Sequence, residues 1–115
     1  MAKLKNIQII AEFYGCNADL ISRAEKVKKI INRAIKKSNL TKLRSHYHQF
    51  RPSGVTGVVL LAESHITMHS WPEYNYIALD LFSCGDKAKA AAAYKQLVKD
   101  FRPAKVKKTV IMRGL

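Results

Sequence analysis

Residues 54–86 read GVTGVVLLAESHITMHSWPEYNYIALDLFSCGD, and this stretch holds much of the extended structure that the sequence predicts. Residues 55–63 are nearly all apolar, which predicts a strand that is buried on both faces. Residues 64–71 are expected to continue in the extended conformation until Pro72 interrupts the hydrogen-bonding ladder. Residues 76–84 alternate between two faces, as a half-buried strand does. The stretch therefore predicts the centre of a β-sheet.

The segments on either side complete an α+β pattern. Apolar, β-rich segments predict further strands at about 6–14, 42–50 and 105–112. One amphipathic helix is expected from a cap at Asn17 to residues 38–40, and a second from a cap at Asp86 to Pro103. The order β-α-β-β-β-α-β predicts one domain over residues 1–115, a two-layer α/β sandwich with two helices on one face of a mostly antiparallel sheet. The other face of the sheet needs a cover, and a partner subunit is the simplest one.

The composition fits a single packed domain. The chain has 115 residues, of which 48% are hydrophobic, enough for a core of ordinary size. No apolar run reaches the roughly 18 residues that a membrane span needs, and the N-terminus shows no signal-peptide cleavage site. We therefore expect a cytoplasmic protein without a membrane partner.

The net charge is strongly positive. Twenty-one basic residues against eight acidic ones give a net charge of +13, which attracts polyanions. A solvated, lysine-rich surface is the simpler interpretation, and nonspecific binding of nucleic acid is the alternative. The two cysteines, Cys16 and Cys84, do not make a disulfide framework, and their spacing does not match a zinc site.

Several reactive side chains crowd into residues 63–73. A serine after a glutamate is by itself an ordinary serine, and the chain has no GxSxG, P-loop, HExxH or GxGxxG motif. His65 and His69 are four residues apart, which separates them by about 13 Å along a strand. We therefore predict no metal site from these histidines.

Four motifs follow one another at close spacing: GVTGVV, ESH, HSWPEY and CGD. Together with the upstream segments AEFYGC and HQF, they resemble the S-adenosylmethionine decarboxylase family in its short prokaryotic, pyruvoyl-dependent form, over roughly residues 8–100. The resemblance implies a two-layer protomer that pairs through its sheets into a four-layer αββα homodimer. It also implies a proenzyme that cuts its own chain.

In that family the bond between the glutamate and the serine of the ESH motif is the one that breaks. Carried over, the Ser64 hydroxyl attacks the Glu63 carbonyl, the amide becomes an ester, and β-elimination frees residues 1–63 from residues 64–115. What is left of Ser64 becomes a pyruvoyl group. This group, in place of pyridoxal phosphate or a metal, would form a Schiff base with the substrate amine and accept the electrons left when CO2 departs.

The resemblance also implies roles for three further residues. His69 would transfer protons during processing, a role that suits an imidazole. Cys84 would return a proton to the substrate carbon, and the Thr56 hydroxyl would hold the oxygen of the scissile carbonyl. Without the motifs, His69 would be interpreted as a buried, hydrogen-bonded histidine and Cys84 as a small buried hydrophobe. Cys16 has no such role in the motifs and is assigned a structural role.

Three residues match positions that bind the substrate in the family. Phe50 would stack on adenine and Glu73 would accept hydrogen bonds from the ribose hydroxyls. Trp71 would wall the pocket, with a place in the core as the alternative. These residues favour S-adenosylmethionine as the substrate, whose decarboxylated product donates the aminopropyl group in polyamine (spermidine) synthesis.

The sequence departs from the family pattern in several places. Residues 6–8 read Asn-Ile-Gln where many members have Gly-x-His, and Ala62 and Thr56 each stand where a serine is common. Relatives of this fold decarboxylate arginine or ornithine with much the same self-processing motif, so both remain alternative substrates. A non-catalytic, basic nucleic-acid-binding module is the third alternative.

Overall fold

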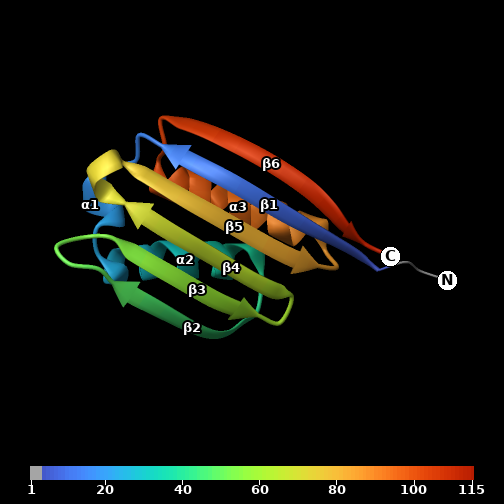
Figure 1. Cartoon of the computed structure of the whole chain (residues 1–115). Coiled ribbons are helices and arrows are strands. Elements are labelled where there is room, and N and C mark those ends of the chain that lie inside the picture. The colour runs from blue at the N-terminus through green and yellow to red at the C-terminus, as the bar shows by residue number, and fades with distance from the viewer. Residues whose placement is uncertain (1–3) are drawn as a thin grey trace.

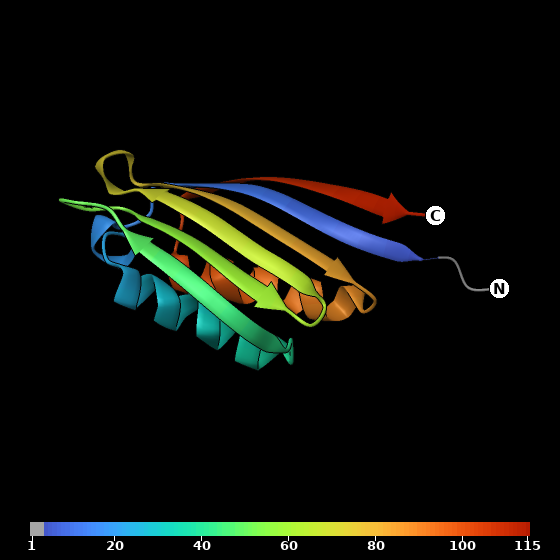
Figure 2. The same ribbon diagram turned by 60° about the horizontal axis from the view of Figure 1, so that its bottom comes forward.

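The computed structural model describes residues 4–115, which form one six-stranded sheet with helices on one of its faces (Figures 1 and 2). The strands are β1 (Lys5–Tyr14), β2 (Lys42–Gln49), β3 (Val55–Leu61), β4 (Ser64–Trp71), β5 (Tyr76–Cys84) and β6 (Lys105–Gly114). The helices are α1 (Ala18–Ile21), α2 (Ala24–Ser38) and α3 (Lys87–Phe101), with a 3-10 turn η1 (Pro72–Tyr74) before β5. The predicted two-layer α+β sandwich is confirmed.

Every neighbouring pair of strands is antiparallel, in the order β2-β3-β4-β5-β1-β6. The order follows from the chain, because β2 to β5 form a meander in which each strand pairs with the next. Strand β1 then lies beside β5, and β6 adds to the outer edge of β1 (Figure 1). Strand β4 therefore lies inside the sheet, between β3 and β5.

The core lies between the sheet and the two long helices. On β5 the residues Ile77, Leu79 and Leu81 are buried, as the predicted alternation requires. The apolar stripe predicted for α3 is buried as well; it consists of Ala90, Ala93, Tyr94, Leu97 and Phe101. The Asp86 carboxylate accepts hydrogen bonds from the backbone of Ala88 and Lys89, so the predicted cap is confirmed.

The prediction of one extended segment over residues 55–71 was wrong, because the chain reverses at Ala62 and Glu63. Leu61 pairs with Ser64 across a two-residue turn, so β3 and β4 form a hairpin. The turn contains none of the Gly, Asn or Asp residues that signal a tight hairpin in a sequence. Its geometry is instead held by Thr41, whose carbonyl accepts a hydrogen bond from the Ala62 N–H (2.8 Å).

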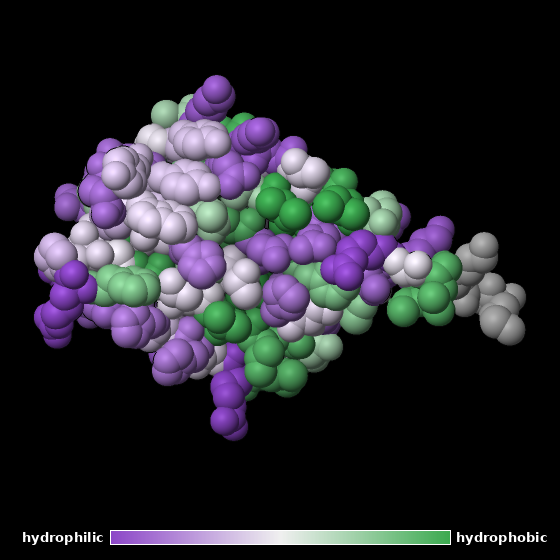
Figure 3. All heavy atoms as spheres, viewed as in Figure 1, coloured by the Kyte–Doolittle hydropathy of each residue, from purple (hydrophilic) through white to green (hydrophobic). Residues whose placement is uncertain are grey.

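Burial of β3 on both faces was also wrong. Val55 and Val59 point into the core, but Val58 and Leu60 lie on the sheet face that the helices do not cover and are 40% and 50% exposed. We call this uncovered side the open face of the sheet; Figure 3 shows it as a mixture of apolar and polar side chains. The apolar run therefore reflects a strand with a second apolar surface that no part of the described chain covers.

The first predicted helix is divided in two. Asn17 caps only the short helix α1, through a hydrogen bond from the Asp19 N–H (2.9 Å), and the chain becomes extended again at Arg23. Helix α2 then begins at Ala24, whose N–H donates to the Gln49 side chain (2.6 Å). The break depends on a residue far along the chain, so the local pattern could not reveal it.

Candidate active site

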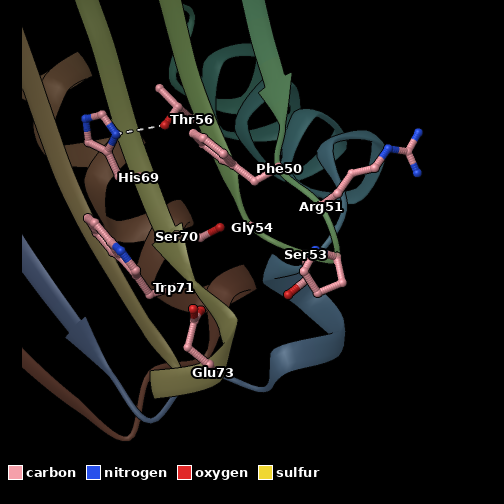
Figure 4. A pocket seen from close by; sticks show the side chains of 10 residues that line it. Phe50, Arg51, Ser53, Gly54, Thr56, His69, Ser70, Trp71 and Glu73 are labelled. Atoms are coloured by element: carbon pink, nitrogen blue, oxygen red, sulfur yellow. Dashed lines mark hydrogen bonds between the residues drawn. The ribbon is translucent and has the colours of Figure 1, made fainter.

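A cavity of about 500 Å³ opens where β3 begins and β4 ends (Figure 4). It is lined by five of the residues that the sequence analysis singled out: Phe50, Thr56, His69, Trp71 and Glu73. They come from the end of β2, from β3, from β4 and from η1, so the meander gathers them at one end of the sheet. We call these five residues the cavity half of the site.

Thr56 and His69 face each other across neighbouring strands. They are register partners, and the Thr56 Oγ1 lies 3.0 Å from the His69 Nδ1 (Figure 4). A hydrogen bond to one ring nitrogen fixes the orientation of an imidazole and the tautomer that it adopts. His69 is exposed on the open face, so the alternative of a buried core histidine is excluded.

Aromatic rings line the same end of the sheet. The Trp71 ring stacks on Tyr76 with centroids 5.4 Å apart, and Tyr76 stacks in turn on Tyr14 at 5.5 Å. On the other side of the cavity the His48 ring meets the Phe50 ring edge-on at 4.6 Å. Trp71 therefore walls the cavity and is not part of the core, and both walls offer flat apolar surfaces to a ring of a ligand.

The loop at residues 50–54 forms the rim of the cavity, and Gln49 holds it in place. The Gln49 Nε2 donates to the carbonyls of Ser22, Phe50 and Gly54, while its Oε1 accepts from Ala24. One side chain thus ties the loop to the junction between α1 and α2. The sequence analysis missed this residue, because its importance depends on partners that are distant in sequence.

Glu63 and Ser64 lie at the opposite end of β4. The Glu63 carbonyl oxygen accepts a hydrogen bond from the Cys84 N–H (2.9 Å), so this donor already points at the carbonyl that the family cleaves. Ser64 has a φ of 150°, a region that residues other than glycine rarely adopt. We call Glu63, Ser64 and Cys84 the cleavage half of the site.

The Glu63 side chain is tied down as well. Its Oε1 accepts a hydrogen bond from the Thr41 N–H (2.9 Å), and this bond lowers the pKa of the Glu63 carboxyl below its ordinary value of 4.5. The side chain and the carbonyl of Glu63 are therefore both fixed, by two different segments of the chain.

The two cysteines differ sharply in their environment. Cys16 is fully buried and its thiol lies 3.9 Å from the Phe13 carbonyl oxygen; burial raises its pKa to about 11. Cys84 is exposed on the open face. This contrast agrees with a structural role for Cys16 and rules out the alternative of a buried Cys84.

The two halves of the site do not meet within one protomer. Ser64 and His69 are five positions apart on β4, which is about 17 Å at the usual rise of a strand. Thr56, expected beside the scissile carbonyl, lies at the cavity end with His69. Among residues 4–115, no three His, Cys, Asp or Glu side chains come together in a way that could hold a metal ion.

No helix in the described part of the chain is long and apolar enough to cross a membrane.

His65 and His69 both lie on β4. The His65 Nε2 lies 4.0 Å from the Asp80 Oδ2.

The comparisons with known proteins point to one family. A family model described as S-adenosylmethionine decarboxylase matches residues 7–114. The chain belongs to this family.

Individual relatives match over nearly the whole chain. An S-adenosylmethionine decarboxylase proenzyme of Aquifex aeolicus is 45% identical over 115 residues, which is all of this chain and 85% of the relative. The proenzyme of Thermoplasma volcanium is 48% identical over 108 residues, 94% of this chain and 83% of the relative. The crystal structure of the Aquifex aeolicus adenosylmethionine decarboxylase superposes with a TM-score of 0.95 at 44% identity, covering 99% of this chain and 94% of that one.

Proposed function

We propose that this protein is a self-processing, pyruvoyl-dependent decarboxylase that removes CO2 from S-adenosylmethionine. The observation that carries the proposal is the fixed Glu63–Ser64 bond: its carbonyl oxygen accepts the Cys84 N–H, and the Ser64 backbone is held in a rarely populated conformation. Membership of the family supplies the reaction.

The self-cleavage begins with attack of the Ser64 oxygen on the Glu63 carbonyl carbon. The new C–O bond replaces the C–N bond, and the Ser64 nitrogen leaves as an amine. Charge builds up on the Glu63 oxygen during the attack, where a pre-aligned N–H such as that of Cys84 is most effective. Conversion of the amide to an ester also frees the Ser64 backbone from its present φ, because the peptide plane on its N-terminal side no longer exists.

β-Elimination then breaks the ester. A base removes the Cα proton of Ser64, the Cβ–O bond breaks, and Glu63 leaves as a new C-terminal carboxylate. In a homodimer that joins the two halves of the site, His69 of the second copy, oriented by the Thr56 of that copy, would suit this proton transfer. Tautomerisation and hydrolysis of the remaining enamine release ammonia and leave the pyruvoyl group, which supplies the electron sink for decarboxylation.

The remaining residues would bind the substrate and handle its proton. Phe50 and Trp71 would enclose the adenine ring, and the Glu73 carboxylate would accept hydrogen bonds from the ribose hydroxyls. The cavity of about 500 Å³ that these side chains line is of the size that small-molecule sites have. The exposed thiol of Cys84 would deliver a proton to the substrate carbon after CO2 has left.

A homodimer would bring the two halves of the site together. Two open faces would stack through a two-fold axis that is parallel to the sheets and perpendicular to the strands. Such an axis reverses the strand direction, so the cavity half of one copy would lie over the cleavage half of the other. The exposed Val58 and Leu60 would then be buried between the sheets. At the cleavage end, Asn6 is the register partner of Cys84, and its Oδ1 is buried without a hydrogen-bond partner among the described residues.

The substrate is tested by supplying carboxyl-labelled S-adenosylmethionine, arginine and ornithine separately to the purified protein and collecting labelled CO2. We expect release from S-adenosylmethionine alone, and none from any substrate with the Ser64→Ala variant. Release from arginine or ornithine alone would mean that the same machinery serves another substrate. An intact chain that releases CO2 from none of them would refute the proposal.

A further inference from the structure

Nearly half of the basic residues of the chain lie in the helix layer, and the proposed reaction uses none of them. Helices α2 and α3 together contain ten basic residues and two acidic ones. Six of the basic side chains border two adjoining hollows that share Lys37 and cross from α2 to α3. We call these six residues the basic helix face: Lys29, Arg33, Lys36, Lys37, Lys95 and Lys99.

Little in the protein neutralises this face. Its acidic neighbour is Asp100, which lies 3.4 Å from the Arg33 Nε and also accepts a hydrogen bond from Gln96. Like charges at i and i+4, such as Lys95 and Lys99, destabilise a helix by about 0.2–0.5 kcal/mol for each pair. Among the described residues the Arg33–Asp100 pair is the one salt bridge that involves this face, so most of the repulsion within the like-charged stripes is not offset.

We infer that the basic helix face binds the phosphate backbone of nucleic acid without sequence preference. The stripe from Lys29 to Lys37 spans about 12 Å along α2, and a duplex of that length carries about seven negative charges. Six basic side chains on two neighbouring helices match such a density of charge.

The apolar content of the face argues against a membrane and against base recognition. The exposed large hydrophobic side chains of the described chain all lie outside α2 and α3, so the helices offer no apolar wedge for insertion into lipid. The two aromatic residues of α3, Tyr94 and Phe101, are buried, so α3 presents no ring for stacking on a base. The face can therefore contact nucleic acid only through its phosphates, and phosphate contacts position the nucleic acid without recognising its sequence.

The basic helix face lies on the opposite side of the sheet from the cavity half. Figure 2 shows helices α2 and α3 on one side of the sheet, whereas Thr56 and His69 lie on its open face. Nucleic acid on the helices would therefore leave the cavity and the open face free. Binding and decarboxylation are separate properties, and failure of one leaves the other standing.

The test is fluorescence anisotropy with labelled 20-base-pair RNA and DNA duplexes, titrated with the full-length protein from 50 to 300 mM NaCl. We expect binding to both duplexes, with an affinity that falls steeply with salt, as about five or six phosphate contacts require. The variant Lys36→Gln/Lys37→Gln/Lys99→Gln should bind at least about tenfold more weakly at 50 mM NaCl, with a salt slope lower by about three. Sedimentation with phosphatidylserine vesicles provides the membrane arm.

The matched control, Lys5→Gln/Lys87→Gln/Lys105→Gln, removes the same net charge outside the face and should bind within about twofold of the parent. All three residues are exposed, so both triple variants should fold, which circular dichroism and thermal melting will verify. An equal loss in the two variants would overturn the inference in favour of net charge alone. No duplex binding at 50 mM NaCl, or binding to vesicles but not to duplexes, would also overturn it.

Discussion

At the scale of single residues, chemistry is decided by which groups the fold leaves reachable and which it fixes. Cys16 and Cys84 are the same residue type, yet Cys16 is buried and Cys84 is exposed to solvent. Ser64 is one of many hydroxyl side chains, but it follows a carbonyl that already accepts a backbone N–H. The motifs located these residues, while their environments became visible only in the structure.

The cysteines give a direct prediction. Iodoacetamide reacts with the thiolate, and at pH 7.5 burial keeps Cys16 protonated, with its pKa raised to about 11. We expect the folded protein to take up one alkyl group, on Cys84, as measured by mass spectrometry of peptides. The Cys84→Ser variant should take up none until it is denatured; alkylation of Cys16 in the folded variant would contradict this.

Glu63 gives a prediction on pH. Because folding lowers the pKa of its carboxyl below 4.5, the unfolded chain binds the proton more readily, and the charge of Glu63 stabilises the fold above that pH. The stabilisation is lost as the pH falls through the folded pKa. In a Ser64→Ala background, which keeps the chain uncut, Glu63→Gln should lower the melting temperature slightly at pH 7.

The difference in melting temperature between the two proteins should shrink as the pH falls below 4.5, because protonation removes the charge of Glu63 and with it the stabilisation. Glutamine keeps an oxygen that can accept the Thr41 N–H, so the comparison isolates the charge. A difference in melting temperature that is constant from pH 3 to 7 would show that Glu63 acts by another route.

At the scale of elements, periodicity correctly predicted which faces of β5 and α3 are buried, because the apolar side chains of both elements pack into the core. It failed at the β3–β4 hairpin and at the break between α1 and α2, where Thr41 and Gln49 hold the chain from a distance. The motifs were enough to predict the residues of the cavity half. They did not predict Gln49, which holds the loop at the rim of the cavity, because the local pattern contains no signal for it.

Gln49 therefore carries a prediction for the loop that it anchors. Gln49→Leu keeps the size of the side chain but removes the partner of the Ala24 N–H and of the Phe50 carbonyl. The carbonyls of Ser22 and Gly54 lose one of their two donors and keep a backbone N–H. Each unsatisfied buried group costs about 1–3 kcal/mol, less where water can enter, so we expect a total loss of about 2–4 kcal/mol in the free energy of unfolding, measured by urea denaturation. The KM for S-adenosylmethionine should rise in parallel.

Gln96→Leu is the matched control. Its Nε2 donates to the Asp100 carboxylate on the helix surface, where such a bond contributes little, and we expect a change below about 0.5 kcal/mol. Equal destabilisation by the two substitutions would remove the special role assigned to Gln49.

At the scale of the whole molecule, the separation of the two halves along β4 is the feature that most constrains function. A second copy is the simplest way to complete each site, and this predicts complementation. We expect Ser64→Ala and Glu73→Ala each to be inactive alone, since one lacks the cleavage half and the other the cavity half.

When the two variants are co-expressed, a mixed dimer would combine the intact Ser64 of one copy with the intact Glu73 of the other. Random pairing gives about a quarter of the parental number of complete sites, and labelled CO2 release should recover to about that level. No recovery, despite dimers of mixed composition in sedimentation and mass analysis, would show that each site is built within one chain.

If the chain cuts itself between Glu63 and Ser64, denaturing mass spectrometry of the freshly purified protein will show the cut. We expect two fragments, residues 1–63 and residues 64–115, the second lacking a free N-terminal amine, and an uncut Ser64→Ala variant. A parental chain that stays at 13.0 kDa after prolonged incubation would contradict this expectation.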